Sequence, residues 1–96
     1  MRVKRLSFEW SETKRAENLK KHGVDFVFAA LIFEGPVLTK IDDRNDYGET
    51  RCISVGLVDE VAYVVVHTSR GEHTRLISAW LGGQKAYGRY KARFPG

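Results

Sequence analysis

The stretch TRCISVGLVDEVAYVVVHTSRGEHTRLISAW, residues 50–80, decides the fold. It contains three runs rich in β-branched and aromatic residues, at 50–57, 61–68 and 73–80, and such runs are typical of strands. Only short polar breaks around Asp59-Glu60 and Arg70-Gly71 separate the runs. Connections this short join antiparallel neighbours, so the stretch predicts a three-stranded meander.

A register for the meander follows if both breaks are two-residue turns. Val55 then lies opposite Val64, and Val64 lies opposite Ile77. One face would be mainly apolar and would form the core beneath the helices: Ile53, Val55, Leu57, Ala62, Val64, Val66, Ile77 and Ala79. The opposite face would be mixed: Cys52, Ser54, Gly56, Tyr63, Val65, His67, Thr74, Leu76, Ser78 and Trp80. A slip of one residue at either turn would exchange these faces.

The N-terminal third predicts a short strand followed by two helices. Residues 6–10 alternate apolar and polar, as a strand does. Ser11 can cap a helix over Glu12–His22, and a glycine follows the last residue of that helix. Asp25 can cap a second helix over residues 26–33, which is apolar on nearly all sides.

The remaining elements complete the fold class. Residues 37–41 resemble a strand, a polar loop follows at 42–48, and residues 84–94 predict a basic helix with aromatic positions. Strands that cluster rather than alternate with helices predict an α+β fold, with an antiparallel sheet of four to five strands, two N-terminal helices and one C-terminal helix. At 96 residues the chain is expected to be a single domain over 1–96.

Composition excludes several classes of protein. The 43% hydrophobic content argues against disorder, and a single cysteine excludes an internal disulfide or a four-cysteine zinc site. No apolar run reaches the ~18 residues that span a bilayer, and the basic start Met1–Ser7 lacks the apolar stretch of a signal peptide. We therefore expect a cytoplasmic protein without a membrane span, with Cys52 as a small, reduced strand residue.

Positive charge is concentrated at the two ends of the chain. Residues 1–23 carry seven Lys/Arg against three Asp/Glu, and residues 71–96 carry five against one, whereas residues 24–50 carry two against six. If both ends meet in space, one face is positive and attracts a polyanion, of which nucleic acid is the first candidate. The alternative is that a chain with a net charge of +4 binds no polyanion.

The sequence offers basic and aromatic side chains rather than a metal or cofactor motif. The three histidines lack ligand spacing and no glycine-rich loop precedes a helix, so no metal site and no cofactor are expected. The candidate residues are Arg51, Tyr63, His67, Arg70, Arg75, Trp80, Lys85 and Arg89. Metal-free RNA cleavage needs a base for the 2′-hydroxyl, positive groups for the transition state and an acid for the leaving oxygen.

We predict His67, Arg70 and Arg75 as catalytic residues. His67 can act as the base or the acid because its reference pKa lies near neutrality, and the two arginines can hold a phosphate through bidentate contacts. The predicted substrate-binding residues are Arg51, Tyr63, Trp80, Lys85 and Arg89. The structural alternatives are a surface histidine at 67 and an Arg75 that pairs with Asp25 or Glu34.

Several segments together resemble the BrnT family of bacterial toxins. The N-terminal matches are Phe8-Glu-Trp10, Lys14, Asn18 and Lys21-His-Gly-Val-Asp-Phe26. The later matches are Asp42 or Asp43, Gly48-Glu49-x-Arg51, Gly56, Val64–Gly71, Arg75–Ala79 and Tyr90. They span nearly the whole chain in the family's order, and the K-H-G-V and R-x-I-S-A elements are the most specific.

The resemblance implies a RelE-like fold and a toxin of a bacterial type II toxin–antitoxin pair that cleaves RNA without a metal and so inhibits translation and growth. It implies a partner, the ribbon-helix-helix protein BrnA, which neutralises the toxin, and a toxin dimer within a two-plus-two assembly. DNA would be contacted only through that antitoxin, in repression of the operon. Residue by residue, the resemblance carries over Arg51, His67, Arg70 and Arg75.

Two positions depart from the family pattern. A strand that usually ends I-S-A-R ends here at Trp80, and Ala86 stands where the next helix usually carries glutamate. Trp80 cannot bind a phosphate as arginine does, although it can stack on a base. A second hypothesis is therefore a catalytically weakened subunit that holds the antitoxin and modulates operon repression. A third is a single-stranded nucleic-acid binder that uses aromatic stacking.

Overall fold

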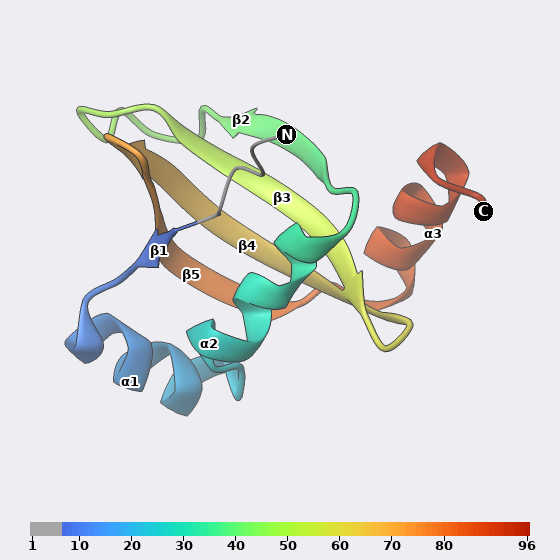
Figure 1. Ribbon diagram of the computed structural model, residues 1–96, viewed down its shortest axis with the longest axis horizontal. Coiled ribbons are helices and arrows are strands. Elements are labelled where there is room, and N and C mark those ends of the chain that lie inside the picture. The colour runs from blue at the N-terminus through green and yellow to red at the C-terminus, as the bar shows by residue number, and fades with distance from the viewer. Residues whose placement is uncertain (1–6) are drawn as a thin grey trace, which may run out of the picture.

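The computed structural model describes residues 7–96, which form a five-stranded sheet with helices on both of its faces (Figure 1). The elements are β1 (Phe8–Glu9), α1 (Glu12–His22), α2 (Phe26–Ala29), the 3-10 helix η1 (Ala30–Glu34), β2 (Leu38–Asp42), β3 (Arg51–Val58), β4 (Val61–Arg70), β5 (His73–Leu81) and α3 (Gly83–Arg93). The predicted α+β class is confirmed. The basic start and the predicted beginning of the first strand at Leu6 lie outside the described residues.

The strands lie in the order β1-β5-β4-β3-β2. The pairs from β5 to β2 are antiparallel, as predicted for the meander. β1 adds to β5 in parallel, so the sheet is mixed rather than wholly antiparallel. The Thr74 amide donates to the Ser7 carbonyl at 2.8 Å and fixes this first strand.

The register of the meander is confirmed on one side and wrong on the other. Val55 lies opposite Val64, and the intervening turn residues Asp59 and Glu60 both have positive φ, as a type I′ hairpin turn requires. Val64, however, lies opposite Trp80 rather than Ile77. The turn falls one residue later than predicted, since Arg70 pairs with His73, and the register shifts again at Val66/His67, where Ile77 has no partner on β4.

The prediction of which face lies beneath the N-terminal helices is wrong for most residues. Val65 and Leu76, predicted on the mixed face, are fully buried beneath α2 and η1. The core cluster consists of Val24, Phe26, Ala29, Ala30, Ile32, Val65, Leu76 and Ala79. Because β4 is buried on both of its faces, apolar alternation along it could not identify the helix-covered face.

The second predicted helix divides into two shorter elements. Asp25 caps α2 as predicted, since its carboxylate accepts from the Val27 amide at 3.0 Å. After Ala29 the chain tightens into η1, which ends at Gly35. Figure 1 shows α2 and η1 crossing the front of the sheet. No helix within residues 7–96 is long and apolar enough to cross a membrane.

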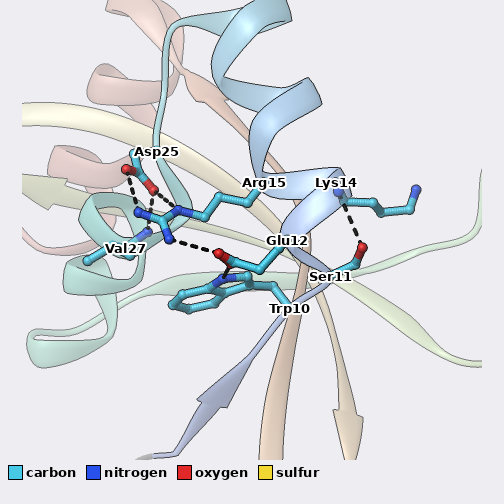
Figure 2. Close-up of polar contacts among 7 residues, drawn as sticks. All are labelled: Trp10, Ser11, Glu12, Lys14, Arg15, Asp25 and Val27. Atoms are coloured by element: carbon cyan, nitrogen blue, oxygen red, sulfur yellow. Dashed lines mark hydrogen bonds and ion pairs between the residues drawn. The ribbon is translucent and has the colours of Figure 1, made fainter.

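The first helix has the predicted bounds because both of its ends are capped. The Ser11 hydroxyl accepts from the Lys14 amide at 3.3 Å, and Gly23 ends the helix with a φ of 71°. Arg15 then joins α1 to the start of α2 through Asp25, with N–O distances of 2.8 and 3.1 Å (Figure 2). This pairing fixes how the two helices meet.

The first helix also covers the edge of β5, along which it lies in Figure 1. The buried Asn18 amide donates to the Ala79 carbonyl at 2.8 Å and accepts from the Ala79 amide at 3.1 Å. A neighbouring strand would make the same two bonds. Asn18 thus satisfies the part of the β5 edge that the two-residue β1 does not reach.

The C-terminal helix packs on the other face of the sheet, at the end away from β1 (Figure 1). Ala86 comes so close to Gly82 that a Cβ on Gly82 would lie 2.6 Å from the Ala86 Cβ and 3.1 Å from Val64. The buried Tyr90 donates its hydroxyl to the Pro36 carbonyl at 2.7 Å. Within residues 7–96, no other helix covers this face between α3 and β1.

Candidate functional site

The sheet face turned away from α2 and η1 carries most of the predicted cationic site residues. Alternation along the strands places Arg51, Thr68 and Arg70 on this face, and the pairing of Thr68 with Arg75 adds Arg75. Trp80 joins them because it pairs with Val64 on the same face. We call this surface, defined by Arg51, Val66, Arg70, Arg75 and Trp80, the open face.

A groove of about 660 Å³ lies on the open face. Its walls come from the last turn of α1 and from the loop between β2 and β3, and its floor comes from β4 and β5. The lining residues are Lys21, His22, Asp42, Arg44, Tyr47, Arg51, Val66, Ile77, Ser78, Trp80 and Leu81. The groove therefore combines cationic and aromatic side chains in one place.

A buried carboxylate organises the loop that forms one wall. The Asp42 side chain has no exposed surface, and it accepts from Arg44 Nε at 2.7 Å and from Arg44 Nη2 at 2.8 Å. The Tyr47 hydroxyl donates to the same carboxylate at 3.2 Å. The hydrogen bonds from Arg44 lower the pKa of Asp42 to about 2. Asp42 thus holds Arg44 and Tyr47 at the groove.

Arg51 is positioned by this loop. Its guanidinium lies 4.1 Å from the centroid of the Tyr47 ring, and its Nε donates to Glu49 at 3.1 Å. The other Glu49 oxygen lies 4.0 Å from Arg70 Nη2. Glu49 therefore stands between two arginines of the open face.

The structure pairs Arg75 with a residue that sequence reasoning did not consider. Its Nη1 donates to Glu9 at 2.7 Å, across the parallel pair of β1 and β5. Asp25, one of the predicted partners, is bound by Arg15 instead. Arg75 is a partner in a structural ion pair, and about a quarter of its side chain (27%) remains exposed at the open face.

His67 lies on the opposite face of the sheet from the three arginines. Its Nε2 is 2.7 Å from the Ser54 hydroxyl, which in turn lies 2.7 Å from the Thr39 hydroxyl. The Phe33 ring packs edge-on against the His67 ring, with 5.1 Å between the ring centroids. Burial lowers the pKa of the His67 ring below its usual value. His67 also lines a recess of about 220 Å³ that reaches Glu49.

The other predicted substrate-binding residues are dispersed. Trp80 lies in the groove beside His22, with their ring centroids 5.9 Å apart. Tyr63 lies on the helix-covered face and packs against Phe28. Lys85 and Arg89 are exposed on α3. Of the eight predicted site residues, the structure brings Arg51 and Trp80 together in the groove, with Arg70 joined to Arg51 through Glu49.

Sequence reasoning gave no site role to several residues that shape the groove. These residues are Lys21, His22, Asp42, Arg44, Tyr47 and Glu49. The sequence could have indicated Lys21-His22, Asp42 and Glu49 as site residues, because they stand in segments that carry the family resemblance. Arg44 and Tyr47 had no such signal, since only the fold of the loop around Asp42 brings them into the groove.

This arrangement can bind a polyanion and stabilise added negative charge. Arg51 and Arg70 present guanidinium groups, and Glu49 supplies a carboxylate between them. Aromatic rings in the adjoining groove offer flat surfaces for stacking.

The model of a protein family matches residues 10–81, from Trp10 just before α1 to the end of β5. The matching family is described as "Ribonuclease toxin, BrnT, of type II toxin-antitoxin system". A comparison with curated proteins found no match.

Proposed function

We propose that this chain, which belongs to the BrnT family of ribonuclease toxins of type II toxin–antitoxin systems, cleaves RNA on the open face without a metal ion. One observation carries the proposal. Arg51, Arg70 and Arg75 lie on the same uncovered sheet face, next to a groove lined by aromatic rings. This arrangement supplies the charge that a cleaved phosphodiester requires.

The arginines have separate roles in this proposal. Arg51 and Arg70 flank Glu49, so a phosphate that approaches them can displace the carboxylate from either guanidinium and take its place. Their positive charge then stabilises the additional negative charge on the phosphorus oxygens in the transition state. Arg75 lies farther along the same face and binds a neighbouring phosphate.

Removal of the 2′-hydroxyl proton has two candidate bases, and the 5′-oxygen that leaves takes its proton from water. Glu49 is favoured as the base for the 2′-hydroxyl because it contacts the two arginines that would hold the phosphate. His67, the base or acid predicted from the sequence, reaches the same end of the sheet only through the small recess that it shares with Glu49. Its lowered pKa keeps the ring neutral, which suits a base rather than an acid.

The partner follows from the family. A type II toxin is neutralised by a protein antitoxin, and we propose a BrnA-type ribbon-helix-helix protein for this chain. The proposed assembly contains two toxins and two antitoxins, and it contacts operator DNA through the antitoxin.

The second candidate function is a catalytically weakened subunit that mainly holds the antitoxin and modulates operon repression. The observation that favours it is the position of Trp80, which places an uncharged ring in the groove where the family pattern has arginine. Ala86, the other departure, packs beside Gly82 and leaves no carboxylate on that turn of α3. This reading predicts a folded chain that binds its antitoxin and leaves RNA intact.

Induced expression in a bacterial host tests the proposal, with growth and bulk RNA integrity as readouts. Wild type should arrest growth and fragment RNA, and Arg70→Gln should relieve both, because Arg70 faces the proposed phosphate. Arg93→Gln is the matched control, since it removes an exposed arginine at the end of α3. Intact RNA in cells that accumulate folded wild-type protein would favour the weakened subunit.

Assays with purified protein test two parts of the proposal separately: the independence from metal ions and the identity of the base. Cleavage of a synthetic RNA should persist in EDTA and should fall about 10²–10⁴-fold in Glu49→Gln, the scale expected for loss of a general base. His67→Gln tests the other base in the same assay. If EDTA abolishes cleavage and added magnesium restores it, the metal-independent mechanism is wrong.

A further inference from the structure

We infer that the groove holds one unpaired nucleobase against the indole ring of Trp80 and so restricts the chain to single-stranded RNA. The inference rests on the proposed function, which it deepens by naming the form of the substrate. It depends on three features of the groove: a half-buried ring, a surplus of cations around it, and a position beside the arginines of the open face.

Trp80 presents an aromatic surface inside a walled groove. Its side chain is half-buried, and it lines the groove together with Val66, Ile77 and Ser78. His22 from α1 stands beside it at 5.9 Å between ring centroids, with the ring planes tilted by 42°. Tilted rings do not stack fully on each other, so the indole keeps surface on which a base can lie.

The charges around the ring suit the backbone that would carry such a base. Lys21, Arg44 and Arg51 line the groove. Asp42, the carboxylate in the same lining, pairs with Arg44 through Nε and Nη2 and accepts from Tyr47. The surplus positive charge comes from Lys21, and from Arg51 once a phosphate displaces Glu49. Phosphates on either side of a stacked base would therefore contact cationic side chains. An uncharged aromatic ligand would gain no binding energy from these side chains.

This geometry selects unpaired nucleotides. A base within a duplex has both ring faces covered by its neighbours and presents only its edges, whereas an unpaired base can turn a face toward an aromatic side chain. The floor of the groove offers a ring face, and its volume of about 660 Å³ has room for a nucleotide. The base on Trp80 would be followed by a phosphate directed toward Arg51 and then toward Arg70.

Tryptophan fluorescence gives a direct readout, because the chain contains two tryptophans in distinct environments. Trp10 donates Nε1 to Glu12 at 2.7 Å (Figure 2). Its ring packs against the buried Phe26 at 6.2 Å, so its signal should not report on the groove. A Trp10→Phe variant isolates the signal of Trp80. If that variant does not fold, the difference between wild type and Trp80→Leu provides the same signal.

The probes are three oligodeoxynucleotide ligands of equal length, which lack the 2′-hydroxyl needed for cleavage. One is single-stranded, one is the same strand annealed to its complement, and one carries abasic sites throughout and keeps only the sugar-phosphate charge. The single strand should quench Trp80 and bind at least about tenfold more tightly than the abasic strand, the scale expected for one stacked base. The duplex should leave Trp80 unquenched.

Two variants complete the test. Trp80→Leu should bind the single strand about tenfold more weakly and should no longer distinguish it from the abasic strand. Phe28→Leu is the control, because it removes a partly exposed ring on the helix-covered face. Equal binding of the single and abasic strands by wild type, or unchanged binding by Trp80→Leu, overturns the inference.

The outcomes also separate this inference from the proposed function. If the chain cleaves RNA but binds the abasic strand as tightly as the base-bearing strand, the nuclease stands and the base site is wrong. If the single strand quenches Trp80 and the chain cleaves no RNA, the base site stands and the nuclease is wrong.

Discussion

Replacement of Gly56 by alanine should destabilise the protein because η1 rests directly on β3 at this residue. An ideal Cβ on Gly56 would lie 2.6 Å from the Ile32 Cβ and 3.3 Å from the Ile32 carbonyl oxygen. Ile32 is itself 1% exposed and belongs to the core cluster, so it has no free space into which to move. The added methyl group must therefore push η1 away from the sheet.

The size of the effect follows from that distance. Carbon atoms in good contact lie about 3.5–4.0 Å apart, so strand and helix must separate by roughly 1 Å. Overpacking of this kind costs about 1–3 kcal/mol. In a domain of this size each kcal/mol changes the melting temperature by about 4–8 °C, so Gly56→Ala should melt about 4–24 °C lower than wild type.

Two other glycines provide matched controls. Nothing lies within 4 Å of a Cβ at Gly35 or at Gly88, and neither residue has a positive φ. Gly88→Ala lies within α3 and should stabilise the protein by about 1 kcal/mol, while Gly35→Ala should change the free energy of unfolding by less than about 0.5 kcal/mol. Thermal unfolding followed by circular dichroism measures all three. A Gly56→Ala protein as stable as wild type would refute the close packing of η1 on β3.

Three further changes test the supports of the fold and the groove. Asn18→Leu leaves the Ala79 N–H and C=O without partners and should lower the free energy of unfolding by about 2–5 kcal/mol in urea titrations; a loss below about 0.5 kcal/mol would contradict the edge role. The pKa of Asp42 is lowered to about 2 in the folded state, so its ion pair stabilises the protein above the usual carboxyl pKa, and that stabilisation disappears as pH falls toward 2. Asp42→Asn should therefore melt at a temperature that changes less between pH 5 and about pH 2.5 than wild type does, and an unchanged slope would argue against the Arg44 pair. Burial lowers the pKa of His67, so wild type should lose stability as pH falls below about 6.5, and His67→Gln should flatten that part of the profile in thermal scans. An NMR titration midpoint for His67 at or above about 6.5 would contradict its burial.

Local signals predicted the elements well because the contacts that define them are local. Ser11 and Gly23 are the two caps of α1, and both act within a few residues of the helix. The turn at Asp59 and Glu60 likewise depends on two adjacent residues. Such contacts are visible in a sequence because the residues that form them are neighbours.

The faces of the sheet could not be predicted in the same way. A single irregularity at Ile77 changed which side chains of β5 share a face with Val64, and no pattern in the sequence marks a bulge. The error placed His67 beside Trp80, whereas the two lie on opposite sides of the sheet. Arg51 and Trp80 were nevertheless predicted as site residues, because the residue types suited the chemistry.

The pairing of Arg75 shows a second limit of sequence reasoning. Its partner Glu9 is 66 positions away, and the parallel addition of β1 that joins them follows from the path of the whole chain. The groove wall around Asp42 depends in the same way on loop geometry that has no periodic signal.

The placement of the first strand against the last has a consequence for the nascent chain. β1 and α1 are synthesised before their partners Thr74, Arg75 and Ala79, which follow more than 50 residues later in the chain. Until those residues emerge, Phe26 and Ile32 have no Leu76 to cover them, and the apolar helix remains exposed to proteases. A cell whose translation is interrupted would therefore release unfinished copies of this chain that lack a closed core, and proteases would degrade these copies before finished ones.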